Sequence, residues 1–86
     1  MNVEHSEIPA GVVLPRKPSC YVQIGPQAKD GTYSMFVKVS VRNAQGRWYG
    51  CTILTARGFT DDDRPMELRK NLRTLAEIRL RGTYGT

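Results

Sequence analysis

Apolar and polar residues alternate along the middle of the chain. From Ser34 to Arg42, a methionine and three valines occupy one parity, and mostly serine, lysine and arginine occupy the other. Because successive side chains of a β-strand point to opposite faces, this alternation predicts a strand over about 33–42 with one buried face and one polar face. The buried face is expected to hold Met35, Val37, Val39 and Val41.

Two further strands are expected beside this central strand. The first covers about 19–25 and is joined to the central strand by a turn that contains Asp30-Gly31, a pair typical of hairpins. The other covers about 47–57 and follows a turn at Asn43–Gly46. The three strands would form an antiparallel sheet.

The sequence leaves two alternatives for which face of the last strand is buried. Ile53 has the parity of Tyr49 and Cys51, whereas Leu54 has the parity of Thr52. Either set can face the core, so alternation alone does not decide the orientation of this strand.

A helical repeat follows the strands. Apolar residues recur on one helix face and cations occupy the other, which predicts a basic amphipathic helix over about 65–80. Pro65 is tolerated only in the first turn, and Asp61–Asp63 favour a helix start, whereas Gly82 is expected to end the helix. The apolar positions are Leu68, Leu72, Leu75 and Ala76.

These elements predict an α+β fold with about three antiparallel strands and one C-terminal helix packed on one face of the sheet. Residues 1–18 carry three of the five prolines and are expected to form an extended N-terminal arm. Residues 19–86 are expected to form a single β-β-β-α domain. A domain this small buries about 60 to 65 per cent of the surface that its unfolded chain exposes. Pairing with a second copy would add core and cover an exposed strand edge, so a homodimer is predicted.

The chain is basic. Thirteen lysine and arginine residues stand against eight aspartate and glutamate residues, which gives a formal net charge of +5 and an isoelectric point near 9.6. This balance favours contact with nucleic acid or another anionic surface and carries no information about the fold.

Several classes of chemistry lack the residues that they need. Cys20 and Cys51 are too few and too far apart for a disulfide framework or a zinc site, and are predicted to be reduced strand residues. His5 is the one histidine, with no second ligand nearby and no nucleophile to activate, so no metal, cofactor, enzyme activity or small-molecule substrate is expected. Asp61–Asp63 are better suited to capping a helix than to binding a cation.

The longest apolar run, Val12–Leu14, is too short to span a membrane, so a soluble, intracellular protein is expected.

The polar face of the expected sheet combines hydrogen-bonding groups, a cation and aromatic rings. Unpaired RNA bases stack on such rings while lysine pairs with phosphate. The same composition also fits a solvated sheet face, and the helix cations Arg69, Lys70 and Arg73 fit a solvated helix surface. The candidate RNA-binding residues are Tyr21, Gln23, Ser34, Lys38 and Tyr49, with the ring of Phe36 beside them.

The order of these features resembles the coat proteins of single-stranded RNA bacteriophages. Each similar segment is common by itself, and the resemblance depends on their sequential order and similar spacing over most of the chain. The segments are Val3–Gly11, Asp30–Tyr33, Phe36–Val41, Trp48-Tyr49 and Thr60–Arg64, followed by the leucine-rich helix.

The resemblance implies that two chains pair edge to edge into one continuous sheet, that each helix crosses the partner's sheet, and that the uncovered face binds an RNA hairpin. It implies that Lys38 corresponds to the lysine that contacts RNA in this family, and that Tyr49 corresponds to the tyrosine that stacks on a base. In place of several N-terminal strands this chain has a proline-rich arm. The connection between its last two strands is short, and few residues follow Leu80.

The sequence therefore predicts a non-enzymatic, coat-like structural protein of a bacteriophage, in the virion or the host cytoplasm. It is expected to bind hairpin or single-stranded RNA as a homodimer or a higher assembly. Two alternatives stay open. The basic helix and the arm would suit a small phage-type inhibitor or adaptor that binds an acidic host protein. A sheet supported by one helix would also suit a DNA-binding module.

Overall fold

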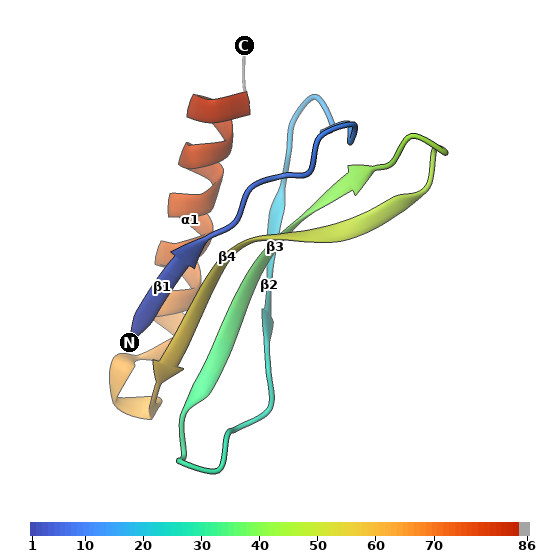
Figure 1. Ribbon diagram of the computed structural model, residues 1–86. Coiled ribbons are helices and arrows are strands. Elements are labelled where there is room, and N and C mark those ends of the chain that lie inside the picture. Colours follow the sequence, from blue (N-terminus) through green and yellow to red (C-terminus); the bar gives the residue numbers. More distant parts are fainter. Residues whose placement is uncertain (85–86) are drawn as a thin grey trace.

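The computed structural model describes residues 1–84 and has an α+β fold (Figure 1). An antiparallel sheet with the strand order β1-β4-β3-β2 carries the helix α1 along one face. The predicted fold class, an antiparallel sheet with a C-terminal helix, is confirmed. The elements are β1 (Asn2–His5), β2 (Cys20–Ile24), β3 (Tyr33–Arg42), β4 (Trp48–Phe59), the 3-10 helix η1 (Asp61–Asp63) and α1 (Pro65–Tyr84).

The central strand β3 supplies the core of the domain. Its four alternating apolar side chains have no exposed surface, as the sequence pattern predicts, and they are Met35, Val37, Val39 and Val41. We call the sheet face that carries them the valine face. The helix side chains in the same buried cluster are Leu72, Ala76 and Leu80. Since α1 covers the valine face, the opposite face of β3 is left for other partners.

A β-bulge in β4 determines which of its residues face the helix. Val37 lies opposite Leu54, but Lys38 lies opposite Thr52, so Ile53 is an additional residue between two paired positions. After the bulge, the even-numbered residues Leu54 and Ala56 of β4 therefore lie on the valine face. Before the bulge, the odd-numbered residues of β4 lie on it. Ile53 and Leu54 are both buried, which explains why alternation alone left the two alternatives open.

β1 adds a fourth strand inside the segment that was expected to be an extended arm. It pairs with the end of β4, from Asn2 opposite Arg57 to His5 opposite Leu54. Val3 is the one apolar residue among its four, so the sequence carries no alternation there that would predict a strand. The sheet consequently has four strands where about three were expected.

The rest of the arm crosses the sheet near the C-terminal half of α1 and continues to the other edge (Figure 1). Backbone hydrogen bonds of 2.8 and 3.0 Å join Val13 to Arg42 at the end of β3. Near the start of the arm, the Arg79 guanidinium of α1 lies 2.9 Å from the Glu7 carboxylate. The apolar side chains that pack against the core are Ile8, Val12 and Leu14. The arm is therefore a folded part of the domain.

The turn before α1 is capped by its own side chains. The Thr60 hydroxyl accepts a hydrogen bond from the Asp62 N–H at 3.3 Å, and the Asp63 carboxylate accepts one from the Thr60 N–H at 2.8 Å. α1 then begins at Pro65, as predicted. The expectation that Gly82 ends the helix is wrong, because α1 continues past it. One glycine costs only about 1 kcal/mol in a helix.

Both cysteines are free and lie in strands, as predicted, and both are buried. Burial raises the pKa of Cys20 to about 11, with a further increase from the Glu77 carboxylate and a partial offset from the Arg73 guanidinium. Burial also raises the pKa of Cys51. Both thiols therefore stay protonated at neutral pH, where a protonated thiol is a poor nucleophile.

Candidate nucleic-acid interface

The sheet face opposite α1 carries polar, cationic and aromatic side chains. Residues paired across antiparallel strands point to the same face, so the register assigns the members of this face. Lys38 lies opposite Tyr21 on β2 and Thr52 on β4, which puts the three residues in one row across the sheet. We call this surface the polar face. Its residues are Tyr21 and Gln23 on β2, Ser34, Phe36, Lys38, Ser40 and Arg42 on β3, and Trp48, Gly50, Thr52, Thr55 and Arg57 on β4.

Tyr21 lies along the polar face because Gly50 has no side chain. A Cβ atom on Gly50 would overlap the Tyr21 hydroxyl, and would lie 3.4 Å from Tyr21 Cζ and 3.6 Å from Lys38 Cδ. Gly50 is on β4, and β3 separates it from β2, so the ring of Tyr21 must extend across the sheet to reach it. Tyr21 is nevertheless 44% exposed. The outer surface of the ring is therefore open to a ligand, directly beside the stem of Lys38.

Arg42 and Trp48 form a second aromatic and cationic pair on the same face. They lie opposite each other on β3 and β4, with Arg42 Cζ 5.7 Å from the centroid of the Trp48 ring. Trp48 is 52% exposed. Lys38 and Arg57 add two more cations to this face. Among residues 1–84, Glu4 on β1 is the acidic residue that the strand register places at the edge of the same face. The polar face is consequently electropositive, with aromatic rings beside its cations.

Four of the five predicted site residues lie on the polar face. Tyr21 is directly opposite Lys38, and Gln23 is opposite Phe36 on the same pair of strands. Ser34 lies four residues before Lys38 on β3, about 13 Å away along the strand. The structure therefore brings Tyr21 and Lys38 together, with Gln23 next to them and Ser34 farther away, near the start of β3.

The prediction that Tyr49 joins Lys38 on the polar face is wrong. Tyr49 lies opposite Val41, so its side chain belongs to the valine face. The cause is the bulge at Ile53, which reverses the parity of the preceding residues of β4. Trp48, one residue earlier, has the aromatic ring that faces the same side as Lys38.

Among the polar-face residues that sequence reasoning did not select, three shape the aromatic and cationic pairs of this interface: Arg42, Trp48 and Gly50. Arg42 has the parity of Lys38 and could have been selected by the same alternation. Trp48 and Gly50 could not, because their face depends on the bulge, and no sequence signal marks Gly50 as the position over which a tyrosine lies.

Among residues 1–84, a second basic surface lies on α1, where Arg69, Lys70 and Arg73 line a hollow with Met66. No group of three or more His, Cys, Asp or Glu residues in that range is arranged to hold a metal ion. On α1, Arg73 pairs with Glu77 at 3.0 Å, so one of the helix cations is already engaged. In the same part of the chain, no helix has the length and apolar character needed to cross a membrane.

Compared with protein-family models, curated proteins and solved structures, the chain has no match. Its function is therefore inferred from the polar face itself.

Proposed function

We propose that this protein is a non-enzymatic RNA-binding protein that uses its polar face to bind unpaired bases of single-stranded or hairpin RNA. The observation that carries the proposal is the Tyr21 ring, which lies along the sheet over Gly50 with Lys38 beside it. A base can stack on the open side of this ring while the Lys38 ammonium pairs with the adjacent phosphate. The Arg42–Trp48 pair offers a second stacking position on the same face.

The geometry favours unpaired bases over a duplex. Side chains that read a duplex must project into a groove and reach base edges there. Tyr21 instead lies along the sheet surface, which suits the flat surface of an exposed base. Stacking tolerates all four bases, so the polar face supplies affinity for unpaired RNA, and sequence preference would come from hydrogen bonds by side chains such as Gln23 and Ser34.

Replacing Lys38 with alanine tests the phosphate contact. We expect affinity for single-stranded RNA to fall about fivefold to tenfold, and the slope of log K against log salt to decrease by about 0.7, because one fewer counterion is released. Fluorescence anisotropy of a labelled RNA over a range of salt concentrations measures both quantities. Lys29→Ala, in the exposed turn between β2 and β3, is the matched control and should change neither. An unchanged affinity and salt slope for Lys38→Ala would argue against the polar face as the site.

We also propose that two chains pair through the edge strand β1. β1 and β2 are the edges of the sheet, and an open edge offers unpaired backbone groups to a second copy. The Arg79–Glu7 ion pair shows which flank of α1 adjoins the β1 side. Leu75, one turn before Arg79, and Ile78 are 44% and 55% exposed near that flank. A two-fold dimer would cover this apolar surface and extend the polar face across both chains.

A charge at Ile78 tests this dimer. In size-exclusion chromatography with light scattering, we expect the unchanged protein to be a dimer and Ile78→Glu to be a monomer, because the glutamate would be buried in the interface. Met66 is 70% exposed on another flank of α1. Met66→Glu should therefore remain a dimer. Equal masses for Ile78→Glu and the unchanged protein would exclude this flank as the interface.

The biological setting that we propose is a coat-like structural role with RNA in a virion. The resemblance of segments such as Phe36–Val41 and Thr60–Arg64 to phage coat proteins supports this setting, as do an open sheet edge and an RNA-compatible face on one small domain.

A further inference from the structure

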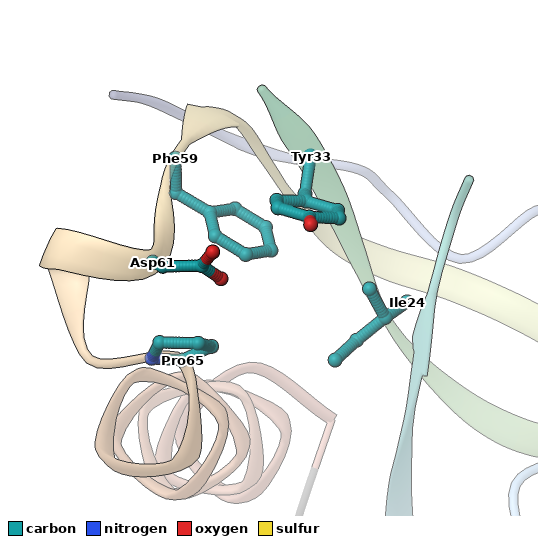
Figure 2. Close-up of a pocket in the computed structure, with 5 residues that line it drawn as sticks. All are labelled: Ile24, Tyr33, Phe59, Asp61 and Pro65. Carbon is teal, nitrogen blue, oxygen red and sulfur yellow. The ribbon is translucent and has the colours of Figure 1, made fainter. Parts of the chain in front are cut away.

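A pocket of about 230 Å³ lies at the end of the sheet where β4 leads into α1. It is lined by Ile24, Tyr33, Phe59, Asp61 and Pro65 (Figure 2). A second bulge, at Gly58 with φ of 78°, turns Phe59 inward opposite Tyr33, and the two rings stack with centroids 5.7 Å apart. The volume is below the roughly 300 to 1000 Å³ of typical small-molecule sites, so it suits a single side chain.

The pocket combines apolar walls with one carboxylate. Ile24 and Pro65 provide aliphatic surface, and the carboxylate of Asp61 points into the space between them and the aromatic rings (Figure 2). Asp63 is engaged in the cap of η1, whereas no residue in the described part of the chain donates a hydrogen bond to the Asp61 carboxylate. A side chain with an aliphatic stem and a cationic end matches this lining. Arginine fits best, because its guanidinium pairs with a carboxylate and stacks on aromatic rings.

The molecule presents such a side chain at its opposite end. The turn between β3 and β4 is far from the pocket along the long dimension of the domain (Figure 1). The Asn43 side-chain carbonyl accepts hydrogen bonds from the N–H groups of Gln45 at 3.0 Å and Arg47 at 2.9 Å, which fixes the turn. Arg47 itself is exposed. The turn therefore offers an ordered, accessible arginine.

Charge is distributed unequally between the two ends. The turns at the pocket end carry four acidic residues, Asp30 and Asp61–Asp63, against the two cations Lys29 and Arg64. At the other end, Arg42 and Arg47 lie in or beside the β3–β4 turn, and no acidic residue occurs between residues 31 and 60. An acidic pocket end and a basic turn end on one molecule are complementary to each other in a second copy.

We propose that Arg47 of one copy inserts into the Asp61 pocket of the next copy. This contact joins two different surfaces, so it is heterologous and can link copies into rings or open chains. It goes beyond the RNA-binding face and the β1-edge dimer, since neither uses the pocket or the turn. A negatively charged pocket repels phosphate, so RNA is not its occupant.

Charge reversal tests the contact in the absence of RNA. All variants are made in the Ile78→Glu background, so that pairing through the β1 edge does not contribute to the measured association. A contact made by one turn is small, so we expect a dissociation constant on the order of 1 mM. Sedimentation equilibrium and concentration-dependent amide shifts at Ile24, Tyr33 and Arg47 measure it. Arg47→Asp and Asp61→Arg should each weaken association at least about tenfold, since like charges then face each other. Asp62→Arg is the control, because Asp62 does not line the pocket.

Mixing the two charge-reversed proteins distinguishes a lost contact from a damaged fold. The Arg47 of the Asp61→Arg protein can still enter the unchanged pocket of the Arg47→Asp protein. The mixture should therefore regain association that neither protein has alone. The Ile78→Glu protein is expected to be a monomer in dilute solution and to associate only when its concentration approaches about 1 mM. The proposal is overturned if it does not self-associate at that concentration, if Asp62→Arg loses as much association as Asp61→Arg, or if the mixture recovers none. None of these outcomes depends on RNA binding, so the proposed function is tested separately.

Discussion

Replacing Tyr21 with alanine is expected to lower the affinity for single-stranded RNA about fivefold to a hundredfold. A base stacked on an aromatic ring contributes about 1 to 3 kcal/mol, and Tyr21 offers an open ring surface beside a cation. Tyr21→Phe keeps the ring and should keep most of the affinity. Anisotropy titrations with one labelled RNA compare the three proteins. Because Tyr21 is exposed, neither substitution should change the free energy of unfolding by more than about 0.5 kcal/mol.

Gly50→Ala should produce a similar loss while leaving every aromatic residue in place. The added Cβ overlaps the Tyr21 hydroxyl, so the ring must swing away from the sheet. The displaced atom is the outer end of a flexible side chain, and the fold should tolerate the change. Gly82→Ala is the matched control, since nothing lies within 4 Å of a Cβ there. It should leave RNA affinity unchanged and stabilise α1 by about 1 kcal/mol. Full affinity for both Tyr21→Ala and Gly50→Ala would eliminate the stacking position.

Met35→Ala is expected to cause a large loss of stability. Met35 has no exposed surface and lies between Ile24 on β2 and Ala56 on β4. Truncating a buried methionine leaves a cavity and costs about 2 to 5 kcal/mol. Small domains are typically stable by about 5 to 15 kcal/mol, so a large fraction of the total would be lost. We expect the melting temperature to fall by about 10 °C or more.

Met66→Ala is the matched control for this substitution. Met66 is 70% exposed on α1, so its truncation should change the free energy of unfolding by less than about 0.5 kcal/mol. Chemical denaturation at one protein concentration compares the two variants with the unchanged protein. Similar, small effects of both truncations would mean that the valine face is not the core of the domain.

The parts of the fold that the sequence predicts are those with a strong repeating pattern. β3 alternates over its whole length because one of its faces is buried under α1 while the other is open, and its bounds agree with the prediction. α1 was found from its leucine spacing and from Pro65. Tyr21 and Lys38 were assigned to one face because each lies in a strand with regular alternation. That part of the site required no knowledge of the tertiary structure.

The parts that could not be predicted depend on irregularities and on pairing between distant segments. The bulge at Ile53 shifts the register by one residue, and this shift moved Tyr49 to the valine face and Trp48 to the polar face. β1 is a strand because the end of β4 is available to pair with it, although Val3 alone gives its sequence little β character. The position of Tyr21 over Gly50 links β2 with β4, which no local pattern encodes.

The intrinsic fluorescence of Trp48 tests the RNA-binding face most directly. Trp48 is the one tryptophan of the chain, and it lies exposed on the polar face against Arg42. When hairpin or single-stranded RNA is added, we predict a saturable change in its emission, with the same midpoint as the anisotropy of the labelled RNA. RNA that binds without altering the Trp48 emission, or emission and anisotropy that titrate at different concentrations, would contradict binding on this face.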